Sequence, residues 1–202
     1  MAWSYPRIAI REVLFLVTLA GIVQCLGAAP ALAEKAKSRS QGAPSVAAAA
    51  QPVRPALPEP AADIREAMLA AVHSGNIEDL QIPLEWNELK PMISSDRVDD
   101  PISHWKKTSA DGEGREILAI LGNILDAGHT TLPVGKDIEN NLVYVWPAIA
   151  EADLSALTPA QEVELYRLVP AAEAKAMREK KTWSWYRVVI GADGTWHSFQ
   201  KH

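Results

Sequence analysis

The C-terminal part of the chain contains the stretch that decides the fold, Thr182-Trp183-Ser184-Trp185-Tyr186-Arg187-Val188-Val189-Ile190-Gly191-Ala192-Asp193-Gly194-Thr195-Trp196-His197-Ser198-Phe199. Aromatic and β-branched residues dominate both arms, as in β-strands. The central Gly191-Ala192-Asp193-Gly194 is typical of a tight turn, because glycine adopts positive φ at little cost. The stretch therefore predicts a β-hairpin. Because so aromatic a hairpin is not stable alone in water, the preceding segments are expected to bury it.

The segments before the hairpin have the patterns of helices, then of two strands, then of helices again. Apolar residues recur at helical spacing in 63–73 and, most strongly, in 117–125, while 84–89 is a short amphipathic piece. Residues 130–134 and 142–146 are expected to be strands. Thr158-Pro159-Ala160-Gln161 is a capping box that begins a further helix, and an alanine-rich helix follows over 171–181. The sequence thus predicts an α+β domain: a helical first half packed on a small, mostly antiparallel sheet that ends in a C-terminal β-hairpin.

The N-terminal segment has the composition of a secretory signal peptide. Arg7 and Arg11 precede an apolar run over 13–23, and Ala31-Leu32-Ala33 is a small-x-small cleavage site before Glu34. We therefore expect residues 1–33 to be a signal peptide and the protein to be periplasmic or secreted, with no integral membrane span after cleavage. Retention of 1–33 as a membrane anchor is the alternative, since the uncharged run is just long enough to span a bilayer.

The remaining chain divides into a linker and one domain. Residues 34–60 are rich in Ala and Pro and lack large apolar side chains, so they are expected to be a disordered linker. Residues 61–202 are expected to form a single α+β domain of ordinary size. The only cysteine, Cys25, lies within the predicted signal peptide, so the mature protein would contain no disulfide and no thiolate nucleophile.

The charge of the chain argues against a role in binding nucleic acid. Without residues 1–33 it would carry 18 basic and 24 acidic side chains, a net charge of about −6. Basic residues do not cluster near the C-terminal aromatic residues. We therefore expect no nucleic-acid partner.

The enrichment in Trp is the strongest functional signal. Trp183 and Trp185 lie two residues apart and would share one face of a strand, while Tyr186 and Val188 would share the other. If the second face is the core, Trp183 and Trp185 point outward and, with Trp146 and Trp196, could bind a sugar ring or a protein surface. The alternative is that the helix over 171–181 covers Trp183 and Trp185.

Signals for catalysis are weaker. His104, His129 and His197 are candidate general bases, but none has the spacing of a metal site or a catalytic motif, and a strand that buries Trp196 would expose His197. The acidic residues of 111–116 precede a helix and are interpreted as helix-capping residues rather than calcium ligands, and those of 137–141 as a solvated loop tip. No metal and no cofactor is therefore expected.

Several segments together resemble a family of uncharacterised secreted proteins of alphaproteobacteria. They are Val143-Tyr144-Val145-Trp146-Pro147, the stretch 157–167 that contains the capping box, Tyr186-Arg187, the stretch 190–196, and Phe199. The resemblance covers the chain from about Asp111 to the C-terminus. It implies an exported cell-envelope protein and assigns no catalytic residue.

Two functions from different classes follow. The first is a non-enzymatic periplasmic module that binds a protein partner or a cell-envelope component such as peptidoglycan through an aromatic sheet face containing Trp146, Trp183, Trp185 and Trp196. The second is a small periplasmic hydrolase that uses a carboxylate and one of the three histidines.

Overall fold

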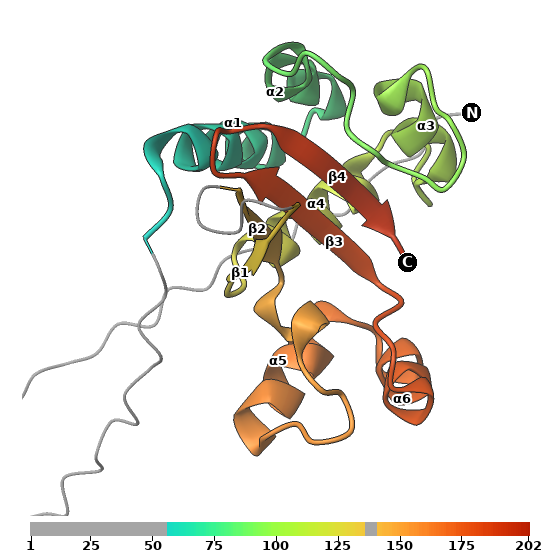
Figure 1. Ribbon diagram of the computed structural model, residues 1–202. Helices are drawn as coiled ribbons and strands as arrows, with labels where there is room; N and C mark the ends of the chain where they lie inside the picture. Colours follow the sequence, from blue (N-terminus) through green and yellow to red (C-terminus); the bar gives the residue numbers. More distant parts are fainter. Residues whose placement is uncertain (1–55, 136–140) are drawn as a thin grey trace, which may run out of the picture. The chain divides into compact units, whose positions relative to one another are not determined.

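The computed structural model describes residues 56–135 and 141–202, which belong to one compact unit within residues 48–202. The α+β class is confirmed, as are the C-terminal hairpin and the antiparallel sheet. The predicted signal peptide, nearly all of the predicted linker and the acidic residues of 137–140 lie outside the described residues. Figure 1 shows the order of the elements along the chain.

The helices that precede the sheet are α1 (Glu59–Ser74), the 3-10 helix η1 (Ile77–Leu80), α2 (Gln81–Glu85), α3 (Pro101–Thr108) and α4 (Arg115–Leu125). Helix α1 begins at Glu59, four residues before the predicted start and within the predicted linker, because Pro60 is tolerated in a first helical turn. It ends at Ser74, and Gly75, with a φ of 69°, forms a left-handed cap. Helix α2 ends at Glu85, so the predicted amphipathic piece 84–89 is helical only at its start.

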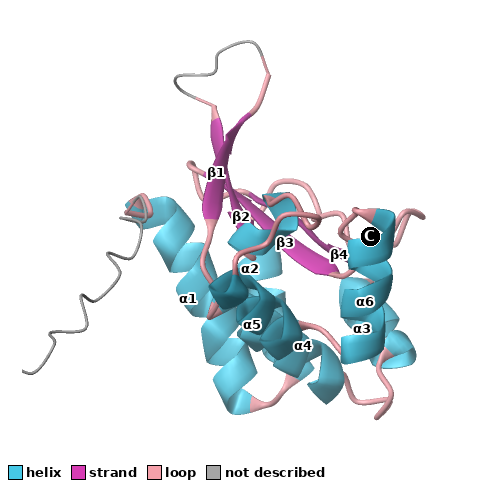
Figure 2. Cartoon of the chain, turned by 90° about the horizontal axis from the view of Figure 1, so that it is seen from below, coloured by secondary structure: helices cyan, strands magenta, loops and turns pink. Residues whose placement is uncertain are grey.

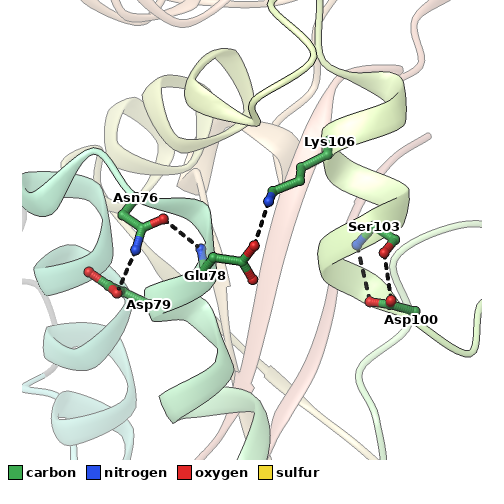
Figure 3. Close-up of polar contacts among 6 residues, drawn as sticks. All are labelled: Asn76, Glu78, Asp79, Asp100, Ser103 and Lys106. Carbon is green, nitrogen blue, oxygen red and sulfur yellow. Dashed lines mark hydrogen bonds and ion pairs between the residues drawn. The ribbon is translucent and has the colours of Figure 1, made fainter.

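Local caps and one ion pair order the first helices (Figure 3). The Asp100 carboxylate accepts hydrogen bonds from the Ser103 backbone N–H (3.1 Å) and hydroxyl (2.6 Å) and so caps α3. Lys106 of α3 forms an ion pair with Glu78 of η1. The Asn76 side chain caps η1 by accepting from the Glu78 backbone N–H. The ion pair therefore joins two elements that are each capped locally.

Helix α4 is the buried central helix that its apolar pattern predicts. Ile117, Leu121 and Leu125 are fully buried along it. Of the acidic residues predicted to cap it, Asp111 does so: its carboxylate accepts from the backbone N–H groups of Gly114 (3.2 Å) and Arg115 (3.1 Å). Figures 1 and 2 show α1 and α4 on one side of the sheet.

The sheet contains β1 (Thr130–Pro133), β2 (Leu142–Trp146), β3 (Tyr186–Gly191) and β4 (Trp196–Lys201), in that spatial order and all antiparallel. The connection from β2 to β3 holds the 3-10 helix η2 (Ala148–Glu151), α5 (Pro159–Leu168) and α6 (Ala171–Lys180). The predicted capping box begins α5, with the Thr158 and Gln161 side chains each bonded to the other's backbone N–H. Gly194 has a φ of 86° in the turn between β3 and β4.

Two hydrophobic cores hold these elements together. The larger one lies between the sheet and helices α1 to α4 and contains Val188 and Ile190 of β3. The smaller one lies among η2, α5 and α6 and contains Leu165 and Met177. Trp185, which precedes β3, packs against both. Among the described residues, no helix is both long enough and apolar enough to cross a bilayer.

Candidate functional site

The four Trp residues predicted to form a binding face do not form one. Trp146 and Trp196 are fully buried in the larger core, and Trp183 is only 8% exposed in the smaller core. Trp185 is half-buried, and the Lys201 ammonium lies 4.6 Å from the centroid of its ring. The expectation that Trp183 and Trp185 point outward together is therefore wrong.

The reason is the position at which β3 begins. The strand starts at Tyr186, so Trp183 and Trp185 lie before it, where the two-residue alternation of a strand does not apply. Trp183 packs in the same core as Ala174 and Met177 of α6, as the alternative interpretation predicted. Its indole Nε1 donates a hydrogen bond to the Tyr186 carbonyl oxygen (3.3 Å).

The histidines are dispersed, and one of them lies beside a carboxylate. His104 is half-buried on α3, and the His129 ring lies 5.1 Å from that of Trp146. His197 is exposed on β4, as predicted from the burial of Trp196. A Cβ atom built on Gly191 would lie 2.4 Å from Asp193 Oδ1 and 3.0 Å from His197 Nε2, so both side chains approach the same point of the backbone.

Asp193 and His197 line a recess of about 260 Å³ together with Asn141. The backbone N–H of Thr195 donates to Asp193 (2.9 Å) and is the main reason why the pKa of Asp193 lies below its ordinary value; the charge of His197 contributes less. No Ser, Thr or Cys is among the described residues that line this recess, so Asp193 and His197 are its candidate reactive side chains.

Several exposed apolar side chains lie on the segment that follows η1. These are large side chains that are all more than half exposed, and Leu89 reaches 80%; they are Ile82, Trp86, Leu89 and Met92. We call these four residues the Trp86 surface. Four large apolar side chains exposed within one short segment make this segment the candidate interaction surface of the described residues.

Residues 86–92 are held in place by β4, whose outer edge they cover. The Asn87 side-chain amide donates to the Trp196 carbonyl oxygen and accepts from the Trp196 backbone N–H, both at 3.0 Å. Beyond it, the Met92 backbone N–H donates to the His197 carbonyl oxygen (2.8 Å), and the Met92 carbonyl oxygen accepts from the Phe199 backbone N–H (2.9 Å). The segment thus satisfies backbone groups of an edge strand while the apolar side chains stay exposed.

Trp86 forms part of a recess of about 420 Å³. Residues 86–89 form one wall, and the turn residues 193–195 form the other. The turn is held by the hydrogen bonds from Thr195 to Asp193 and by the packing of Gly194 against Pro60 at the start of α1. A second recess, of about 590 Å³, is lined by residues 88–99 and shares Glu88 and Leu89 with the first.

The charges in the two recesses differ. Glu88 and Asp193 are the charged side chains of the Trp86 recess, and neither takes part in an ion pair within the described part of the chain. In the second recess, Lys90 donates to the Asp99 carbonyl oxygen and Arg97 pairs with the Asp99 carboxylate (3.3 Å). The recess beside Trp86 is therefore lined by two acidic residues and by no Lys, Arg or His among the described residues, although Asp193 also faces His197 in the neighbouring recess.

Sequence reasoning did not select the Trp86 surface. Residues 84–89 were predicted to be a short amphipathic piece, but α2 stops at Glu85. Pro83 and Pro91 were the available signals of a short, irregular segment. Within residues 56–135 and 141–202, no group of three or more His, Cys, Asp or Glu side chains is arranged to hold a metal ion.

Comparisons of the chain with protein-family models, curated proteins and solved structures give no match. The site must therefore be interpreted from its own residues.

Proposed function

We propose that this chain is an exported, non-enzymatic module that binds a protein partner or another component of the bacterial cell envelope. Export is inferred from the signal-peptide pattern of residues 1–33 and from the resemblance to secreted proteins. The structural observation that carries the binding role is the Trp86 surface. It replaces the predicted face of Trp146, Trp183, Trp185 and Trp196, because buried rings do not present a surface to a ligand.

The geometry of the Trp86 surface supports binding more than a role in folding. A segment needed only to cover the edge of β4 would require Asn87 and the Met92 backbone, which make the hydrogen bonds. The exposed side chains of Trp86 and Leu89 add nothing to that contact. Trp is the residue most often found at the energetic centre of protein interfaces, since its large rigid ring buries much surface at little entropic cost.

Envelope crosslinking tests this proposal. A tagged chain is crosslinked in intact cells and purified, in its native form and with Trp86→Ala and Leu89→Ala combined. We expect the native chain to retain a stoichiometric partner or a wall fragment and the double variant to lose it. The matched control is Val163→Ala with Tyr166→Ala, which removes two exposed apolar side chains from α5.

Two outcomes would count against the proposal. Equal recovery of the partner with the native chain and the double variant would show that the Trp86 surface does not bind it. Recovery of the chain with residues 1–33 intact in the cytoplasmic fraction would contradict export, whereas N-terminal sequencing of a mature form is expected to begin at Glu34.

A second candidate function rests on the approach of Asp193 to His197. A hydrolase of this kind would use His197 to deprotonate water, with the negative charge of Asp193 stabilising the imidazolium that forms. The matched test is hydrolysis of a chromogenic ester by the native chain and by the His197→Gln variant. Activity that disappears with His197→Gln and persists in the Trp86→Ala, Leu89→Ala double variant would favour the enzyme over the binding module.

A further inference from the structure

We propose that the Trp86 recess receives the side chain of a lysine or arginine from an extended, apolar segment of a partner polypeptide. This inference rests on the proposed binding function and adds the chemistry of the occupant. Three features of the site carry it: the charge of the recess, the exposed indole at its wall, and the apolar side chains beyond it.

The charge of the recess favours a cation. Glu88 on one wall and Asp193 on the other are both acidic, and no basic side chain is among the described residues that line the recess. A cation that enters the recess is attracted by both carboxylates, and the charge of His197 offsets only part of that of Asp193.

The wall formed by Trp86 suits a lysine or arginine more than a metal ion. The indole is 56% exposed and is the strongest partner for a cation among the aromatic side chains. Lysine and arginine also carry methylene groups that pack on an aromatic ring while the charged end reaches a carboxylate. A lysine already packs on an indole ring in this fold, since the Lys201 ammonium lies 4.6 Å from the centroid of the Trp185 ring.

The surface beyond the recess indicates that the cation belongs to a polypeptide. Leu89 is shared between the two recesses, and Ile82 and Met92 extend the apolar area along the same segment. A small amine would fill the recess and leave these side chains in water. An extended segment with apolar residues on either side of its lysine or arginine would cover them as well.

The wall residues are held before the ligand arrives. Asn87, next to Trp86 in the chain, is fixed by two hydrogen bonds to the Trp196 backbone, and Asp193 is fixed by the Thr195 backbone and hydroxyl. Both walls thus depend on the same end of the turn between β3 and β4, where Thr195 meets Trp196. A site held in this way loses little entropy on binding, so even a short segment can be recognised.

The test uses two synthetic capped peptides as probes. One contains lysines among leucines and glycines, and the other has glutamate at each lysine position. Each is titrated into the chain in the form in which cells produce it, and binding is followed by NMR at the indole N–H of Trp86, assigned by its loss in Trp86→Phe. We expect the lysine peptide to bind and the glutamate peptide not to bind. The affinity for the lysine peptide should fall several-fold between about 50 mM and about 500 mM salt.

Variants separate the two parts of the site. Trp86→Ala should weaken binding of the lysine peptide by roughly five- to thirty-fold. Glu88→Gln keeps the shape of its side chain and should weaken binding by roughly two- to five-fold. Glu164→Gln and Tyr166→Ala on α5 are the matched controls and should leave the affinity unchanged. If Trp86→Ala fails to fold, the Glu88→Gln variant and the salt dependence still decide the question.

Four outcomes would overturn the inference. Equal binding of the lysine and glutamate peptides would show that charge is not recognised. An affinity unaltered by Glu88→Gln and by salt would exclude the carboxylates. Binding of a chito-oligosaccharide that depends on Trp86 but not on Glu88 would identify a glycan site instead. If the crosslinked envelope component still depends on Trp86 and Leu89 while the lysine peptide does not bind, the proposed function stands and only the cationic occupant is excluded.

Discussion

Trp105 of α3 stacks on Trp196 of β4, with ring centroids 5.9 Å apart and an angle of 18° between the planes. Both side chains are fully buried, and the centroid of the Phe199 ring lies 5.9 Å from that of Trp105 in the same core. This pair joins a helix from the first half of the chain to the last strand. The pair therefore ties α3 to β4. The backbone of Trp196 also bonds to the Asn87 side chain and so holds the segment that carries the Trp86 surface.

Truncation of the pair should destabilise the protein strongly. Trp105→Ala removes a fully buried ring and leaves a cavity, so the free energy of unfolding should fall by about 3–5 kcal/mol. Trp86→Ala is the matched control, since the same side chain is removed from a surface position; its cost should be below about 1 kcal/mol. Urea unfolding followed by far-ultraviolet circular dichroism measures both. Similar losses from the two variants would contradict the assignment of Trp105 to the core.

The turn that forms one wall of the recess depends on a glycine for two reasons. Gly194 has a φ of 86°, and a Cβ atom added there would lie 2.9 Å from the Pro60 carbonyl oxygen. Gly75 has a similar φ of 69° with no heavy atom within 4 Å of the added Cβ. Gly75→Ala therefore measures the cost of the left-handed conformation alone, which is about 1–2 kcal/mol.

Gly194→Ala should cost at least about 1 kcal/mol more than Gly75→Ala, because the Pro60 backbone cannot move away from the added methyl group as a flexible side chain could. Chemical denaturation of the two variants in parallel gives the difference directly. Equal losses would mean that α1 and the turn separate easily. In that event the wall that contains Asp193 would not be held in the manner described.

Local signals in the sequence predicted much of the fold. The capping box at Thr158 and the Gly194 turn are determined by neighbouring residues, so the sequence is sufficient to place them. The strand β2 and the buried helix α4 follow from dense runs of apolar residues. Burial of Trp196 and exposure of His197 also follow, because adjacent residues of a strand face opposite sides.

The candidate site could not be predicted in the same way. Trp86 is exposed because the segment after α2 is fixed to β4 through Asn87, which bonds to a residue 109 positions away in the sequence. No local pattern encodes such a contact. The error over Trp183 has a similar origin: its burial is decided by α6, and the strand begins three residues later than the aromatic run suggests. Aromatic residues alone therefore do not distinguish a core from a binding face.

The cap of α4 should make stability depend on pH in acid. The Ser109 hydroxyl donates to the Asp111 carboxylate and, with the backbone N–H of Arg115, holds the pKa of Asp111 below its ordinary value of 3.8. The folded state therefore binds this proton less readily than the unfolded state. The stabilisation is present above about pH 4 and is lost as the pH falls through the lowered pKa.

Ser109→Ala removes the strongest of these hydrogen bonds, so the pKa of Asp111 should move up towards its ordinary value. A carboxyl carbon NMR titration of the native chain and of the variant measures this pKa. The variant should also lose less stability between pH 5 and pH 3. A native Asp111 that titrates at 3.8 or above would show that the capping bonds do not favour the ionised form.

Trp183 should behave as a core residue and not as a ligand-binding residue. Its ring is buried with Met177 in the smaller core, and its indole N–H donates to the Tyr186 carbonyl oxygen. Trp183→Ala should lower the free energy of unfolding by about 3–5 kcal/mol. Trp183→Phe keeps most of the apolar volume and loses the hydrogen bond, so its cost should be nearer 1–2 kcal/mol.

A comparison of binding by Trp183→Phe and by the Trp86→Ala, Leu89→Ala double variant separates stability from recognition. At a temperature where Trp183→Phe is fully folded, its recovery of the crosslinked envelope component should equal that of the native chain, while Trp86→Ala with Leu89→Ala loses it. The comparison is informative because both changes remove Trp side chains, one from inside the fold and one from its surface. If folded Trp183→Phe lost the component and the Trp86 variant kept it, the binding surface would lie beside α6 instead of beside β4.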